Sequence, residues 1–256
     1  MICMKALLKH PFRITGRGLW LICELMFAAL AFVVQCAFRS KEEALPARSL
    51  WLHRSSRRVL RIFGKSPEVT GSIPSSGLLV CNHLSYLDIL VLAACSPAVF
   101  MAKQEVRSWP VFGWFARMAG TLFVQREKRT HAGKMTEEME SVLARGVLLI
   151  LFPEGTSSDG QTVLPFKSSL LEPAARQIYP ISAGFIQYEL EDGDVTEEVC
   201  YWKDMTLFPH LINLLSKRPV GASVRFTQLH QGSTNRKELA RQLHSEVVKL
   251  SEAIAV

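Results

Sequence analysis

The chain has 256 residues and a formal net charge of +7, enough length for one large α/β domain or a domain with an appendage. The charge is uneven: residues 1–63 hold 11 Lys and Arg against 3 acidic residues, and the remainder holds 19 against 20. No nucleic-acid-binding motif accompanies the basic segment, so we expect no nucleic-acid partner. A basic segment beside an apolar one is instead typical of attraction to anionic lipid headgroups.

The first predicted element is an apolar helix over Leu19–Phe38. About 20 helical residues span roughly 30 Å, enough to cross a hydrocarbon core. Glu24 interrupts the run and leaves an uncharged part, Leu25–Phe38. We expect a membrane-associated helix, either transmembrane or re-entrant. A signal peptide and a buried core helix remain alternatives, although no cleavage site with a secreted-looking start follows. Basic residues on both sides of the run leave its orientation open.

A second helix is predicted over Ala47–Phe63, where aromatic and apolar residues alternate with arginines in a pattern that suits a membrane interface. The segment 64–77 is rich in Gly, Pro and Ser and predicts connecting structure. The expected organisation is therefore a helical membrane-associated region at 1–63, a linker at 64–77, and a globular domain at 78–256.

Strand-like and helix-like runs alternate after Gly77, which predicts an α/β fold. The predicted strands are Leu78–Asn82, Ala98–Ala102, Thr121–Gln125, Val147–Phe152, Ile181–Gln187 and Ser223–Gln228. The predicted helices are Tyr86–Ala94, Val106–Met118, His131–Ala144, Ser168–Arg176 and Leu207–Leu215, followed by a C-terminal amphipathic helix carrying Leu239, Leu243, Val247, Leu250 and Ile254 on one face.

The six cysteines show neither metal-site nor Cys-x-x-Cys spacing, which favours small buried side chains in a reducing compartment. His131, His210, His230 and His244 also lack the spacing of metal ligands. A metal-dependent hydrolase is therefore not favoured, and we expect no metal site.

The stretch Asn82-His83-Leu84-Ser85-Tyr86-Leu87-Asp88 places an imidazole and a carboxylate in a predicted strand-to-helix turn. A turn can fold Asp88 back onto the ring of His83, which fixes the tautomer and leaves the second ring nitrogen as a general base. The alternative is a capping Asp88 beside an unrelated histidine. Ser85 is expected to cap the helix; a role as covalent nucleophile is the competing interpretation.

A second segment, Phe152-Pro153-Glu154-Gly155-Thr156, follows another strand-like run. Together these segments resemble the glycerolipid acyltransferase (PlsC-like) family, whose signature is Asn-His, four residues, then Asp. Two further blocks of that family fit Gly120 to Arg126 and Tyr179-Pro180-Ile181. The resemblance covers roughly residues 75 to 230. One departure is Ser157, which stands where the family usually has Arg.

The resemblance implies a mixed central sheet flanked by helices, with the segment 78–256 as the acyltransferase domain. It implies acyl transfer from acyl-CoA or acyl carrier protein to the free hydroxyl of a lysolipid, with no cofactor. His83 would take the hydroxyl proton and Asp88 would orient its ring. The first-turn amides of the helix after His83 are expected to stabilise the oxyanion.

The residues expected to bind the acceptor are Lys103, Arg126, Glu154, Gly155 and Thr156, with the two cations on its phosphate. Ser157 removes one usual positive charge, for which Lys167 could compensate.

Lysophosphatidic acid is the first expected acceptor, giving phosphatidic acid. Lyso-ornithine lipid is the alternative, because the segments 201–207 and 209–211 resemble a subgroup that contains both kinds of enzyme. A different class, an inert lipid-binding or remodelling module, is disfavoured by the intact His83 and Asp88. The expected location is a bacterial inner membrane, with the catalytic domain on the cytoplasmic side.

Overall fold

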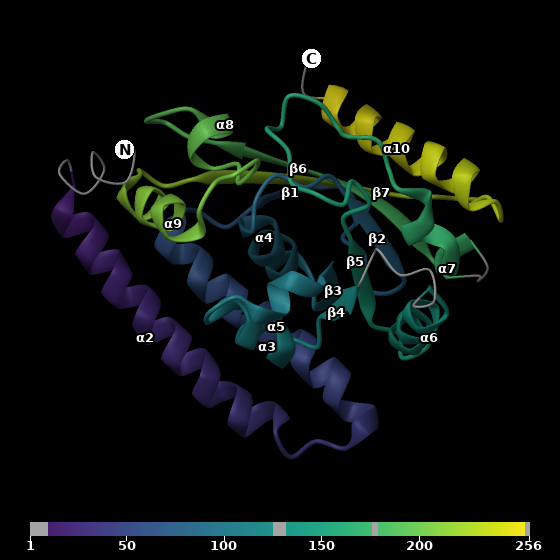
Figure 1. The fold of residues 1–256 in the computed structure, drawn as a ribbon, viewed down its shortest axis with the longest axis horizontal. Coiled ribbons are helices and arrows are strands. Elements are labelled where there is room, and N and C mark those ends of the chain that lie inside the picture. Colours follow the sequence, from purple (N-terminus) through teal and green to yellow (C-terminus); the bar gives the residue numbers. More distant parts are fainter. Residues whose placement is uncertain (1–9, 125–131, 176–178, 254–256) are drawn as a thin grey trace.

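A computed structural model describes residues 10–124, 132–175 and 179–253, and its centre is a seven-stranded sheet (Figure 1). The strand order is β1-β7-β6-β2-β5-β3-β4, and every neighbouring pair is parallel except β6 with β7. The predicted mixed sheet is therefore confirmed. The strands are β1 (Glu68–Thr70), β2 (Leu78–Cys81), β3 (Ala98–Lys103), β4 (Leu122–Val124), β5 (Leu148–Leu151), β6 (Ile181–Glu189) and β7 (Gly221–Gln228).

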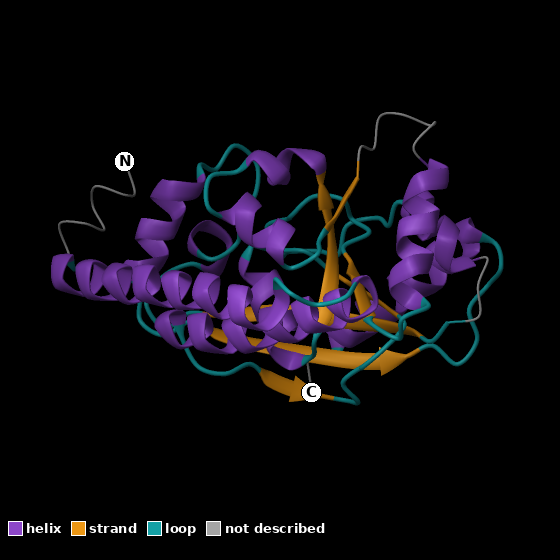
Figure 2. Ribbon diagram, turned by 90° about the horizontal axis from the view of Figure 1, so that it is seen from below, coloured by secondary structure: helices purple, strands orange, loops and turns teal. Residues whose placement is uncertain are grey.

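Helices cover both faces of the sheet (Figure 2). One layer holds α2 (Pro11–Cys36), α3 (Lys41–Phe63), α4 (Leu87–Cys95), α5 (Phe112–Met118) and α9 (Leu207–Ser216). The other holds α6 (Ala132–Leu143), α7 (Glu172–Ala175) and α10 (Arg236–Glu252). Shorter helices are η1 (Gln104–Ser108), η3 (Ser168–Leu171) and α8 (Val195–Glu198). Because successive strand residues point to opposite faces, Leu79 and Cys81 join the first core and Leu78 and Val80 the second.

The apolar helix expected over Leu19–Phe38 is observed over Pro11–Cys36. Two further predicted helices are irregular in the structure. The helix expected over Val106–Met118 is divided into η1 and α5, because Pro110 lacks a backbone N–H and Val111 adopts a positive φ of 62°. The helix expected over Ser168–Arg176 begins as the 3-10 turn η3, and its last residue lies outside the described residues. Within the segment 64–77, Glu68–Thr70 forms the edge strand β1 beside β7.

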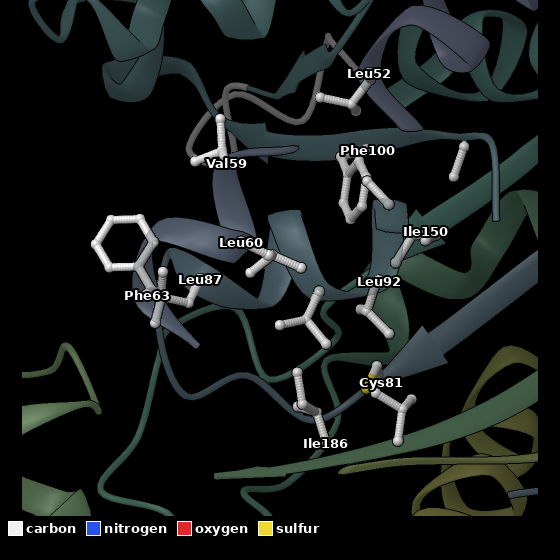
Figure 3. Packing of buried hydrophobic residues seen from close by; sticks show 14 of the residues in the cluster. Leu52, Val59, Leu60, Phe63, Cys81, Leu87, Leu92, Phe100, Ile150 and Ile186 are labelled. Atoms are coloured by element: carbon white, nitrogen blue, oxygen red, sulfur yellow. The ribbon is translucent and has the colours of Figure 1, made fainter. Parts of the chain in front are cut away.

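The helix α3 is part of the core. Its side chains Leu52, Val59, Leu60 and Phe63 face residues of α4 and of the sheet (Figure 3). Trp51 is 1% exposed, and its indole N–H donates to the carbonyl of Ala28 on α2 at 2.8 Å. The predicted helix over 47–63 is thus present, extends back to Lys41, and joins α2 to the sheet domain.

The helix α2 lies along this layer beside α3 (Figure 1). Arg13 and Arg17 donate to the carbonyls of Ser216 at 2.8 Å and Lys217 at 2.6 Å, at the end of α9. Glu24 forms a 2.8 Å ion pair with Arg58 of α3. By length and composition, α2 could cross a membrane, and only 17% of its most apolar window is buried, which is unlike a core helix.

Candidate active site

Parallel strands bring three of the predicted blocks to one edge of the sheet. The carboxyl ends of β2, β5 and β3 lead to His83, to Phe152–Thr156 and to Lys103, respectively. Such an edge is where α/β enzymes usually place their ligands. Arg126, expected after β4, lies outside the described residues.

Asn82 continues the pairing of β2 with β6 after the backbone of β2 leaves the sheet. The last backbone register pair is Cys81 with Gly184. Beyond it, the Asn82 amide donates to the carbonyl of Ile186 at 3.0 Å and accepts from its N–H at 2.8 Å. The side chain thereby replaces a backbone partner, and the chain is free to turn at His83.

His83 and Asp88 make the contact predicted from their spacing. The ring Nδ1 lies 2.7 Å from Oδ2 of Asp88, whose side chain is fully buried. The same oxygen accepts from the N–H groups of Leu84 at 2.7 Å and Ser85 at 3.0 Å. An ionised carboxylate cannot donate, so Nδ1 carries the proton and Nε2 keeps a lone pair. The His83 side chain is 21% exposed, so a reactant can reach it.

The ring is also held by its face. Phe152 stacks on His83 with centroids 4.1 Å apart and planes 15° apart. The backbone N–H of Ser158 donates to the His83 carbonyl at 2.9 Å, which ties the loop after β5 to the loop after β2. The contact of Phe152 with the imidazole was not predicted from the sequence. The signal that could have indicated it is the place of Phe152 at the end of a predicted strand, in the same segment as Glu154.

The expected helix cap at Ser85 is wrong. Its Oγ is buried and has no hydrogen-bond partner among the described residues. The N–H of Asp88 donates instead to the Ser85 carbonyl at 3.1 Å, and the Asp88 carboxylate accepts from the N–H groups of Leu84 and Ser85 in the turn before α4. These two amides precede α4, so they lie outside the helical turn that is expected to supply the oxyanion donors.

Glu154 is a buried carboxyl in the loop after β5, only 2% exposed. Neither oxygen has a partner at ordinary hydrogen-bond geometry among the described residues, although the N–H groups of His83 and Leu164 favour its charged form. Burial is the larger effect and raises its pKa to about 8. A protonated carboxyl there can donate as well as accept.

The rest of this loop lies close to the histidine. Gly155 occupies the left-handed region with φ 76°, which a side chain would strain, and Thr156 is exposed. The hydroxyl of Ser157 donates to the carbonyl of Tyr201, whose N–H in turn donates to Leu84 at 2.8 Å. Ser157, at the position where the family usually has Arg, thus links the loop after β5 to the segment that contains Tyr201.

Two lysines take different positions at this edge. Lys103 is exposed at the end of β3. Lys167 is also exposed, and its backbone N–H donates to the Pro153 carbonyl at 2.9 Å. Within the described ranges, no group of three or more His, Cys, Asp or Glu could hold a metal ion.

One close neighbour had no sequence signal. The hydroxyl of Tyr188, on β6, donates to Oδ1 of Asp88 at 2.7 Å. A separation of 100 positions and a place within an ordinary strand gave no reason to pair it with Asp88.

Known proteins resemble this chain in sequence and fold. Residues 66–184 match the Acyltransferase family. The lyso-ornithine lipid O-acyltransferase of Brucella abortus (strain 2308) is 35% identical over 77% of this chain and 80% of its own length. A 1-acyl-sn-glycerol-3-phosphate acyltransferase of Neisseria gonorrhoeae is 34% identical over 52% of this chain and 56% of its own.

A solved structure shares the fold: PlsC, the 1-acyl-sn-glycerophosphate (LPA) acyltransferase of Thermotoga maritima, is 21% identical, with a TM-score of 0.61 over 93% of this chain and 97% of that one. The similarity in sequence places the chain in the PlsC-like acyltransferase family, as an enzyme that acylates a lysolipid acceptor.

Proposed function

We propose that this chain moves a fatty acyl group from a thioester donor to the free hydroxyl of a membrane lysolipid, with His83 as general base and Asp88 orienting it. The observation that most supports this proposal is the 2.7 Å contact between Nδ1 of His83 and the fully buried Asp88 carboxylate. This contact leaves the basic Nε2 of His83 for the acceptor hydroxyl.

The proposed reaction is a direct transfer. The Nε2 atom of His83 takes the proton of the acceptor hydroxyl while the oxygen attacks the thioester carbonyl. The tetrahedral intermediate then expels the thiolate, which receives the proton from the imidazolium. An ester and a free thiol result, and the histidine is again neutral. No acyl-enzyme is needed, so Ser85 has no covalent role.

The acceptor is proposed to lie along the strand ends. Lys103 and Arg126 would bind an anionic headgroup, since charge-assisted hydrogen bonds suit phosphate or carboxylate. Thr156 and Gly155 offer a hydroxyl and close backbone approach, and a protonated Glu154 would donate to an acceptor oxygen.

Two acceptors are candidates, each favoured by an observation. Lysophosphatidic acid is favoured by Lys103 at the strand end and by the name of the Neisseria gonorrhoeae relative. Lyso-ornithine lipid is favoured by Ser157, which carries no charge and is bound to Tyr201, and by the name of the Brucella abortus relative. The donor is acyl-CoA or acyl carrier protein, both acidic, which the basic N-terminal region would attract.

The enzyme is proposed to act at the surface of a bacterial inner membrane, from the cytoplasmic side. The exposed apolar face of α2 and the basic residues near it favour this location.

A paired assay tests both the mechanism and the acceptor. Purified full-length protein is given labelled acyl-CoA or acyl carrier protein with lysophosphatidic acid or lyso-ornithine lipid in vesicles. We expect product from one acceptor in clear excess, and a loss of ~10²–10⁴-fold for His83→Ala. Near wild-type transfer by His83→Ala, at an unchanged Tm, would overturn the mechanism.

A further inference from the structure

A buried tyrosine lies behind the carboxylate that contacts the histidine. Tyr188 is 3% exposed, and its hydroxyl donates to Oδ1 of Asp88 at 2.7 Å. The other oxygen, Oδ2, already receives three donors, from His83, Leu84 and Ser85. Among the described residues, Tyr188 is the one side chain that donates to Oδ1. Both oxygens are therefore fixed, and rotation of the carboxylate would break bonds on each side.

The direction of this hydrogen bond is set by chemistry. A carboxylate accepts only, so the phenol must donate. Burial, with the charge of Asp88 beside it, raises the pKa of Tyr188 well above its ordinary value, and the hydroxyl keeps its proton. A buried charge without enough donors is costly, so this bond also compensates Asp88 for its loss of water.

The position of Tyr188 next to Asp88 is set by the strand β6. Residues two apart in a strand point to the same side, so Tyr188 follows Ile186 on one face of β6. Asn82 binds both backbone groups of Ile186 and fixes the register of β6 beside the histidine loop. Asn82, which precedes His83 in the sequence, thus also fixes the position of Tyr188, the residue that donates to Asp88.

We propose that Tyr188 is a positioning residue for acyl transfer, acting through Asp88 to hold the His83 ring in its productive orientation. The inference rests on the proposed roles of His83 and Asp88. A hydrogen bond to a charged group that is lost inside a protein typically corresponds to roughly ten- to hundredfold in an equilibrium or rate. We therefore expect Tyr188→Phe to lower kcat by that factor and to leave KM for donor and acceptor within about twofold.

A double-mutant cycle separates this role from general support of the fold. The full-length protein is compared with Tyr188→Phe, Asp88→Asn and the double variant, by kcat, KM and Tm. If Tyr188 acts through Asp88, its removal costs less than about twofold once Asp88 is replaced. Tyr86→Phe is the matched control, because it removes another phenol hydroxyl, one that is partly buried and pairs with His210 at 3.0 Å and not with Asp88. It should keep kcat within about twofold.

The outcomes are distinct. An unchanged kcat in Tyr188→Phe, or the same loss in both backgrounds, overturns the proposal. Full activity in Asp88→Asn itself overturns the proposed mechanism instead. If Tyr188→Phe does not fold, 3-fluorotyrosine placed at 188 keeps the ring and makes the donor more acidic. By Brønsted behaviour kcat should then change at least about twofold at constant KM, and an unchanged kcat overturns the proposal.

Discussion

Asn82 and Ile186, 104 positions apart, are joined by two hydrogen bonds between one side-chain amide and one residue's backbone. Asn82→Asp keeps the acceptor but turns the donor into an oxygen that faces the Ile186 carbonyl. We expect a loss of ~1–3 kcal/mol in the free energy of unfolding, measured by urea denaturation. Asn235→Asp is the control, since Asn235 caps α10 through its oxygen alone and Asp caps equally well. Equal stability of Asn82→Asp and wild type would contradict the dual bond.

Glu154 should make stability depend on pH. Burial raises its pKa from 4.5 to about 8, so the folded protein keeps a proton that the unfolded chain releases. The raised pKa of Glu154 therefore contributes on the order of a few kcal/mol to the free energy of unfolding. This contribution is fully present below about pH 4.5 and is lost as the pH rises to about 8. Glu154→Gln cannot ionise, so its Tm should fall less than that of wild type between about pH 5 and about pH 8.

The comparison with an exposed carboxylate isolates this effect. Glu197 is exposed on α8, and Glu197→Gln should follow the wild-type pH dependence. Parallel curves for Glu154→Gln and wild type would show that Glu154 is ionised in the folded protein at neutral pH.

Arg126 is predicted to bind the anionic headgroup of the acceptor. Charge-assisted bonds contribute ~1.5–3 kcal/mol each, so Arg126→Ala should lower kcat/KM for an anionic acceptor by roughly ten- to hundredfold. The dependence on the acyl donor should change little. Arg145→Ala is the control, because Arg145 is exposed just after α6 and donates to Ser141 of that helix. An unchanged kcat/KM for the acceptor would remove Arg126 from the site.

The sequence was most informative where a motif follows a continuous buried strand. The runs of β2 and β5 are buried on both faces and were recognised by composition, so the positions of His83 and Glu154 followed directly. The His83–Asp88 contact was also predictable, because both residues belong to one turn.

Long-range and irregular features were not predictable in the same way. Tyr188 reaches Asp88 only because β6 pairs beside β2, a relationship that no local pattern carries. The strand β1 is exposed at every position and has no hydrophobic period. The cap expected at Ser85 is absent because the N–H of Asp88, which the Ser85 hydroxyl would have bound, donates to the Ser85 backbone carbonyl instead.

The role of α3 in the core gives a prediction on truncation. A protein that begins at Ser66 lacks Trp51, Ile62 and Phe63, each nearly fully buried, and should not fold, since losing even one large core side chain costs ~3–5 kcal/mol. A protein that begins at Ser40 keeps α3 and its cap, the Ser40 hydroxyl that accepts from the Glu43 N–H, and should retain most of the secondary structure. Circular dichroism and cooperative thermal unfolding compare the two. Cooperative unfolding of the Ser66 protein would contradict the assignment of α3 to the core.

The last prediction concerns the outer face of α2. Met26, Leu30 and Val34 follow one another at intervals of four on α2, and Phe38 lies just beyond its end; the four side chains are 69%, 64%, 75% and 92% exposed. These four exposed apolar side chains can insert among the acyl chains of a bilayer, which is favourable by ~0.8 kcal/mol per buried CH₂. Salt does not screen this interaction. The full-length protein should therefore sediment with anionic vesicles and stay bound in high salt.

Replacing the four residues with Gln should release the protein from those vesicles without lowering its Tm, because the changed side chains contact little else. Arg57→Gln, on the exposed side of α3, should weaken binding only at low salt. If α2 instead contributes nothing to binding, the fourfold variant will sediment like wild type after a high-salt wash. In the expected case, the released variant should acylate vesicle-embedded acceptor poorly and detergent-dispersed acceptor normally, since only the approach to the bilayer has been removed.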